Sequence, residues 1–173
     1  MLKIATHNSV TGEKGSTMWD VLLTPFARCQ SKTLEEQYSV GVRYFDIRYK
    51  WSEKRGCYVC GHGLWTSSKT LREVLTWLDE QGDCYAMVSC EKGAPLSKQA
   101  IQNMINKYRN LAFTTFNRKK PRWQCYYMNL PIAYKIGYRV LDWSSWHTLL
   151  PIPWLWRKEV PSTCEVFTFV DFV

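Results

Sequence analysis

Short runs of β-branched and aromatic residues alternate along the chain with segments in which apolar residues recur at helical spacing. The strand-like runs cover 2–6, 41–48, 58–61, 84–90 and 166–170, with less clear ones over 123–128 and 136–143. Helical spacing covers 18–28, 33–38, 70–81 and 97–110. Pro25 is expected to interrupt the first of these helices. The alternation predicts an α/β fold.

Polar residues stand where several of the predicted strands end: His7, His62, Glu91, Lys92 and Asp171. In a βα barrel the carboxyl ends of the strands meet at one face, so the layout predicts a TIM-like (β/α) barrel with its site there. About 200 residues is the usual lower size of such a barrel. The 173 residues therefore predict a compact, reduced barrel in a single domain over 1–173, with some helices replaced by loops.

Asp46 and Arg48 carry the most informative charges within an apolar strand. They are two residues apart, so both side chains leave the same face of the strand. A carboxylate and a guanidinium at this place are costly unless they act together. Two interpretations stay open on this pattern: a structural ion pair that closes a barrel end, and a pair that serves a catalytic site with His7 and His62.

Composition and charge limit the classes of partner and the cellular location that we expect. The net charge of +8 and the pI near 9.2 favour anionic partners, such as phosphate esters, phospholipid head groups or nucleic acid. No apolar run of about 18 residues is present, and the first residues lack a signal-peptide pattern. We therefore expect a protein that is cytoplasmic in the producing cell or released without Sec export. Seven cysteines, an odd number, are expected to be reduced thiols.

Several blocks together resemble the catalytic X region of phosphatidylinositol-specific phospholipases C, most closely the bacterial type and its small eukaryotic relatives. The blocks are Thr6-His7-Asn8-Ser9, Gln37 followed by Gly41-Val42-Arg43-Tyr44-Phe45-Asp46-Ile47-Arg48, His62-Gly63-Leu64, Ser89-Cys90-Glu91-Lys92 and Phe167-Thr168-Phe169-Val170-Asp171-Phe172. The resemblance implies a phosphodiesterase (a phosphorus–oxygen lyase) that converts phosphatidylinositol, or a related inositol phospholipid, to diacylglycerol and a cyclic inositol phosphate.

This cleavage needs a base for the attacking hydroxyl, an acid for the departing alkoxide and a cation for the phosphoryl oxygens. Histidine suits both proton transfers. The resemblance implies His7 as the base toward the inositol 2-hydroxyl and His62 as the acid toward the diacylglycerol oxygen. It implies that Arg48 binds the phosphate and that Asp171 orients His7. The expected site is completed by Asp46 and by three substrate-binding residues, Asn8, Glu91 and Lys92.

The family has a metal-free and a calcium-dependent branch, and this chain combines features of both. Asn8 and Glu91 resemble the calcium-dependent branch, whereas Arg48 resembles the bacterial, metal-free branch. We expect no cofactor, because the guanidinium would stand where the ion binds. If calcium were required, its ligands would be Asn8, Asp46 and Glu91.

Simpler interpretations stand beside the catalytic ones. His7 could cap a turn, and His147 is better explained as a packed or surface residue than as a third catalyst. The spacing Cys57-x-x-Cys60-x-His62 invites a zinc site, but no second ligand pair follows at a suitable spacing. The basic run over 118–122 is typical of a solvated loop, although it could also meet anionic lipid.

Two rival classes stay open. One is another barrel phosphodiesterase, acting on glycerophosphodiesters or resembling sphingomyelinase D, but such enzymes normally carry acidic metal ligands where this chain has Arg48. The other is a virion or effector protein that retains the barrel without turnover. Nucleic-acid binding is not expected, because no motif for it is visible.

The expected partners are a phospholipid substrate and a membrane surface to which a monomer binds peripherally. The segment 143–158 contains Trp143, Trp146, Trp154 and Trp156 beside two cations. Tryptophan favours the head-group level of a bilayer, so this segment could be an interfacial anchor; it could equally be a lid packed on the barrel wall.

Overall fold

The computed structural model describes residues 4–116, 125–128, 138–140 and 167–170. Its strands are β1 Ile4–Thr6, β2 Val42–Ser52, β3 Cys57–His62, β4 Trp65–Thr70, β5 Tyr85–Lys92, β6 Ala112–Phe116, β7 Cys125–Met128, β8 Tyr138–Val140 and β9 Phe167–Val170. Its helices are the 3₁₀ helix η1 Ser9–Gly12 and the α-helices α1 Met18–Ala27, α2 Leu34–Ser39, α3 Leu71–Gln81 and α4 Lys98–Lys107.

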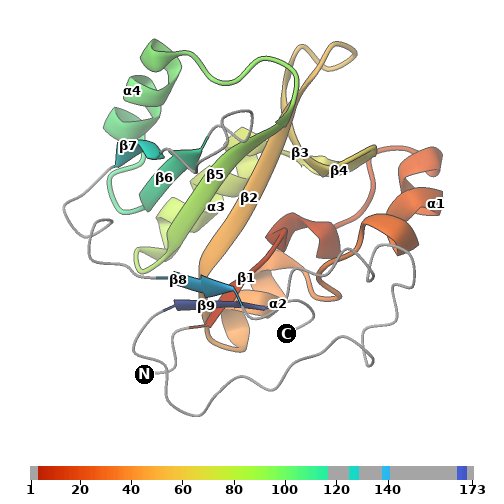
Figure 1. Ribbon diagram of the computed structural model, residues 1–173, viewed down its shortest axis with the longest axis horizontal. Coiled ribbons are helices and arrows are strands. Elements are labelled where there is room, and N and C mark those ends of the chain that lie inside the picture. The colour runs from red at the N-terminus through yellow and green to blue at the C-terminus, as the bar shows by residue number, and fades with distance from the viewer. Residues whose placement is uncertain (1–3, 117–124, 129–137, 141–166, 171–173) are drawn as a thin grey trace.

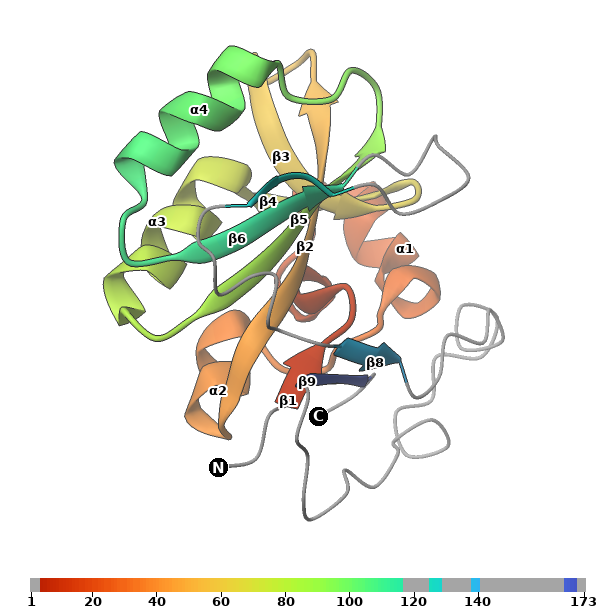
Figure 2. The ribbon, with the colours of Figure 1, turned by 60° about the vertical axis from the view of Figure 1, so that its left-hand side comes forward.

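The described strands form one mixed sheet with the order β7-β6-β5-β2-β1-β9-β8, from which the β3–β4 hairpin branches at β2. From β6 to β8 all neighbours along this order are parallel. Figures 1 and 2 show the long β2 at the centre, with α2, α3 and α4 along one side and α1 apart from them, beside the hairpin. The α/β class is confirmed. The sheet is a curled half-barrel, and in the described part β7 and β8 do not pair, so a closed barrel stays a prediction.

Local sequence signals explain why the helices begin and end where they do. Thr70 caps α3: its side chain accepts a hydrogen bond from the Glu73 amide, and Glu73 bonds back to the Thr70 amide. Gly82 ends the helix with a φ of 78°, a conformation that glycine adopts without a steric penalty. The helical spacing of α3 produces one buried face, formed by Leu71, Val74, Leu75 and Leu78. α2 begins with a capping box of Thr33 and Glu36, and the Ser97 side chain caps α4.

One expectation about local structure was wrong. Pro25 does not break its helix, because it lies in the last turn of α1, where it removes a single backbone hydrogen bond and the Arg28 amide still bonds to the Thr24 carbonyl. One strand was not predicted. After His62 the chain makes the two-residue turn Gly63–Leu64 and returns as the antiparallel strand β4.

The arrangement of β1 and β2 positions the site. The short β1 ends at Thr6, which lies beside Phe45, whereas β2 continues to Ser52. Beyond the end of β1, the polar face of β2 is therefore open to the residues that follow Thr6. None of the described helices has the length and apolar character needed to cross a membrane.

Candidate active site

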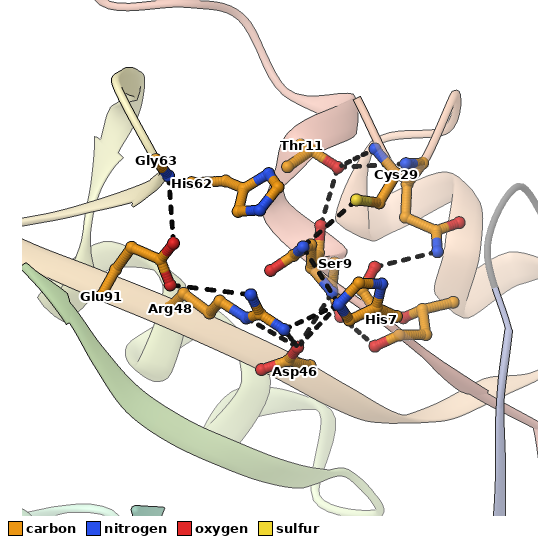
Figure 3. Close-up of polar contacts among 12 residues, drawn as sticks. His7, Ser9, Thr11, Cys29, Asp46, Arg48, His62, Gly63 and Glu91 are labelled. Carbon is orange, nitrogen blue, oxygen red and sulfur yellow. Dashed lines mark hydrogen bonds and ion pairs between the residues drawn. The ribbon is translucent and has the colours of Figure 1, made fainter. Parts of the chain in front are cut away.

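His7, Asp46 and Arg48 meet where β1 ends. Arg48 donates from Nη2 to Nε2 of His7 at 2.7 Å and from Nε to Oδ2 of Asp46 at 3.0 Å. Asp46 Oδ2 also lies 4.0 Å from His7 Nε2. All three side chains are buried. Figure 3 shows them close together, with His7 from the loop after β1 and the other two from β2. Asp46 and Arg48 share one face of β2, as predicted, but they lie inside the strand and not at its end, because β2 continues as the partner of β3.

The carboxylate of Asp46 is the buried anion that compensates Arg48. Burial opposes its ionisation, but the charge of Arg48 and the hydrogen bonds from the Asn8 amide and Arg48 hold the pKa of this carboxyl below its usual value. Its Oδ2 also accepts a hydrogen bond from the Asn8 backbone amide at 3.1 Å. Asp46 therefore stays ionised and fixes both the guanidinium and the loop after β1.

Asn8 completes the surroundings of the His7 ring. Its Nδ2 lies 3.2 Å from His7 Nε2 and donates to the Cys29 thiol at 3.2 Å. Two donors, from Arg48 and Asn8, thus face one ring nitrogen, which requires that Nε2 carry a lone pair. Neutral His7 with its proton on Nδ1 satisfies this geometry. Asn8 has a φ of 46°, a left-handed conformation that Asn tolerates better than most residues.

His62 reaches the cluster from the other side, at the end of β3 (Figure 3). Its Nδ1 lies 3.0 Å from the carbonyl oxygen of Ala27, the last residue of α1. Because a carbonyl oxygen only accepts hydrogen bonds, Nδ1 carries a proton and donates, and Nε2 takes no part in this bond. Burial lowers the pKa of His62, and the charge of Arg48 acts in the same direction. The Ala27 hydrogen bond and the charge of Glu91 oppose this effect.

Glu91 contacts both Arg48 and the turn that follows His62. One carboxylate oxygen lies 3.6 Å from Arg48 Nη1, and the other accepts a hydrogen bond from the Gly63 amide at 3.1 Å. Glu91 thus contacts both the guanidinium and the residue directly after His62. Lys92, the last residue of β5, is exposed and lines a neighbouring pocket of about 380 Å³ together with Lys50, Trp51 and Leu64.

A second group of residues, which sequence reasoning did not identify, supports the loop after β1. Thr11 Oγ1 accepts from the amides of Cys29 and Gln30, and the Gln30 side chain donates to the His7 carbonyl at 3.1 Å. Gln37, part of the predicted motif, donates to the Ser9 carbonyl at 2.8 Å. Nothing in the local sequence marks the segment after α1 as part of the site, because its contacts are made by backbone atoms, a thiol and a single amide side chain.

The contacts of Arg48 oppose a divalent cation among the candidate ligands, and the expected absence of a cofactor stays a prediction. Of the candidate ligands Asn8, Asp46 and Glu91, the first two each have a buried oxygen without a hydrogen-bond partner in the described part of the chain. However, the Arg48 guanidinium lies between the Asp46 and Glu91 carboxylates and contacts both. In the same part of the chain no cluster of three or more His, Cys, Asp or Glu residues could hold a metal ion.

Other predicted residues lie outside the described residues. These are Asp171, His147, the basic run over 118–122 and the tryptophan-rich segment 143–158. The orientation of His7 by Asp171 therefore stays a prediction, as do both interpretations of the tryptophans.

Comparisons with known proteins bear on the fold. The structure is similar to the phosphatidylinositol-specific phospholipase C from Listeria monocytogenes, with a TM-score of 0.52 and 18% sequence identity over 82% of this chain and 61% of that one. It is also similar to a double mutant of the phosphatidylinositol-specific phospholipase C from S. aureus, with a TM-score of 0.50 and 18% identity over 68% of this chain and 47% of that one. No protein-family model and no curated protein matches the sequence.

These similarities show that the chain has a fold of the kind found in these two bacterial proteins. The chain spans less than two thirds of the length of either structure.

Proposed function

We propose that the protein is a phospholipase C-like phosphodiesterase that cleaves phosphatidylinositol, or a related inositol phospholipid, to diacylglycerol and a cyclic inositol phosphate. The observation that carries the proposal is the meeting of two histidines from different elements around one buried arginine. A merely structural ion pair between Asp46 and Arg48 would not need a guanidinium nitrogen 2.7 Å from an imidazole lone pair.

In the proposed reaction His7 is the general base. Its Nε2 lone pair accepts the proton of the inositol 2-hydroxyl, and the resulting alkoxide attacks phosphorus to form the cyclic diester. The bond between phosphorus and the diacylglycerol oxygen breaks as this happens. His62, protonated on Nε2, donates that proton to the departing oxygen, while its Nδ1 stays bonded to the Ala27 carbonyl. The next turnover requires that the proton move from His7 back to His62 or be exchanged with solvent.

Arg48 is the proposed phosphate ligand. Its Nη1 lies near Glu91 and its Nη2 near His7, and Asp46 Oδ2 contacts both Nε and Nη2, each at 3.0 Å. A phosphate would replace the contacts with Glu91 and His7 and leave those with Asp46, so the guanidinium would meet the phosphoryl oxygens from a fixed position. Fixed charges aimed at developing negative charge are among the largest contributions to catalysis.

Substrate binding and metal requirement follow from the same geometry. The pocket beside Lys92 would receive part of the substrate next to the phosphate position, and Glu91 and Asn8 would bind hydroxyl groups or orient Arg48 and His7. Because the guanidinium fills the space between the carboxylates, we propose that turnover needs no calcium. We also propose that the protein acts as a monomer.

A membrane surface is the proposed site of action. Helix α1 exposes five large apolar side chains, each more than half accessible: Met18, Trp19, Val21, Leu22 and Phe26. Leu64, in the turn after His62, is also exposed. We name these six residues the apolar surface. The apolar surface adjoins the site for two reasons. Ala27, the last residue of α1, forms a hydrogen bond with His62, and Leu64 lies two positions after His62. A lipid surface is its proposed occupant, since the substrate is itself a membrane lipid.

The test is a substrate panel with the purified protein. Phosphatidylinositol should give a cyclic phosphate before any linear product. His7→Ala and His62→Ala should each remove nearly all of the rate, since general acid–base catalysis contributes about 10²–10⁴-fold per group. Cleavage of glycerophosphodiesters or sphingomyelin in place of inositol lipids would support the rival phosphodiesterase class. No cleavage of any of them would support a protein without turnover.

A further inference from the structure

Lys50 lies on the same face of β2 as Asp46 and Arg48, one step further along the strand. Its ammonium donates to the carbonyls of the three residues directly after His62: Gly63 at 3.3 Å, Leu64 at 3.2 Å and Trp65 at 2.8 Å. An ammonium has three protons, and these three acceptors use all of them. Lys50 is therefore bonded to the turn that follows His62 and is not placed to bind an anion.

The aliphatic part of the Lys50 side chain is also closely packed. A Cβ atom added to Gly61 would come within 2.8 Å of Lys50 Cε and 2.6 Å of the Trp65 carbonyl oxygen. Only a glycine before His62 leaves room for the Lys50 side chain to cross the hairpin at this place. Three carbonyl dipoles that converge on one point repel each other, and the half-buried ammonium neutralises them.

A second contact holds the same turn from the neighbouring strand. Glu91 accepts a hydrogen bond from the Gly63 amide, so the carbonyls of the turn are held by Lys50 and its first amide by Glu91. His62 is paired with Trp65 across the hairpin, and its ring is fixed at Nδ1 by Ala27. Arg48 is part of β2, whereas His62 is held relative to β2 through the turn that Lys50 binds. A shift of the turn would therefore move the imidazole relative to Arg48.

We propose that Lys50 is a positioning residue for His62, which holds the imidazole where it can protonate the leaving group. This inference rests on the proposed function, in which His62 is the general acid. Lys50 and Arg48 then act as two successive cations on one strand face: the first toward the hairpin that carries the acid, the second toward the phosphate.

The experiment uses two substrates that differ in their need for an acid. An inositol phosphodiester with an alkyl leaving group needs protonation, whereas one with a nitrophenyl leaving group departs as a stable anion. Lys50→Met should lower kcat/KM for the alkyl substrate about 10-fold or more, a fraction of the about 10²–10⁴-fold that an acid contributes. The nitrophenyl substrate should lose less than about threefold. Lys54→Met, which removes the same charge from an exposed position of the β2–β3 turn, should change neither.

Imidazole NMR provides a readout that is independent of turnover. Lys50→Met should change the nitrogen shifts and the titration of His62 and leave those of His7 as they are. An unchanged ratio of the two kcat/KM values, or unchanged His62 signals, would overturn the inference. If the wild-type protein cleaves neither substrate, the proposed function fails, and the NMR result alone decides whether Lys50 positions His62. Should Lys50→Met not fold, Lys50→Arg carries the same test, because a planar guanidinium cannot meet three carbonyls as a tripod does.

Discussion

At the scale of single residues, His62 has to carry a proton in an environment that disfavours one. Burial lowers its pKa below the ordinary value of 6.5, and the charge of Arg48 adds to this effect. The proton-carrying form of the free enzyme is therefore lost as the pH rises through this lowered pKa. A bound phosphodiester is an anion, and it would raise the pKa of His62 again.

We therefore predict different pH profiles for kcat/KM and kcat. For an alkyl substrate, kcat/KM should fall on its alkaline side with a midpoint below pH 6.5, because this parameter reports the free enzyme. The alkaline limb of kcat should lie at higher pH, since the substrate anion stabilises the imidazolium. With a nitrophenyl substrate, which needs no acid, the wild-type protein should lack this alkaline limb. An alkaline limb with the same midpoint for both substrates would contradict the role of His62.

Arg48 offers a second test at this scale. Arg48→Lys keeps the charge but loses the planar fork that contacts Asp46, His7 and Glu91 at once. We predict a loss of about 10²–10³-fold in kcat/KM, the range seen when one donor to a developing oxyanion is removed. The matched control is Arg43→Lys, because Arg43 bonds to Asp83 away from the site.

Excess chelator should leave the wild-type rate unchanged. A divalent ion within a few ångströms of the guanidinium would face a repulsion of order several kcal/mol at an effective dielectric near 20. Loss of turnover with chelator and its recovery with calcium would show that Arg48 does not replace the metal. Asn8, Asp46 and Glu91 would then have to be the ligands.

At the scale of elements, α1 is the clearest candidate for contact with lipid. Trp19→Ser with Leu22→Ser should weaken binding to phosphatidylinositol vesicles about 10-fold or more, because burying each such side chain contributes about 1.5–3 kcal/mol. Cleavage of a soluble inositol phosphodiester should be unchanged, since both residues are exposed. Vesicle binding is measured by sedimentation and unfolding by circular dichroism.

Val40→Ser is the control for this pair, since Val40 is an exposed apolar residue at the end of α2, away from α1 (Figure 2). A double variant that binds vesicles like the wild type would contradict the proposed role of the apolar surface.

Elements with strong periodicity were predictable from the sequence, and others were not. α3 combined an apolar face with a Thr cap and a final glycine, and its bounds followed directly. β4 contains Thr66, Ser67, Ser68 and Lys69 and lacks the alternation that marks a strand, because its edge position requires few apolar contacts. The contact of Asp46 with Arg48 followed from their spacing.

The surroundings of the histidines could not be read from the sequence, since the Ala27 carbonyl and the Cys29 thiol reach the site only through the fold. Sheet order likewise depends on pairings between distant segments. β9, near the end of the chain, lies beside β1, which places the beginning and end of the described chain together in the sheet.

At the scale of the whole molecule, the net charge of +8 adds a long-range attraction to the contacts of α1. Exposed charges are screened by salt, with a Debye length of about 10 Å at 0.1 M and about 3 Å at 1 M, whereas apolar burial is not screened in this way. We predict that binding to anionic vesicles weakens steeply as salt increases and approaches the affinity for zwitterionic vesicles. The α1 double variant should lose affinity by the same factor on both kinds of vesicle, because it alters only the apolar contribution. Binding to anionic vesicles that does not depend on salt would show that the positive charge takes no part in reaching the membrane.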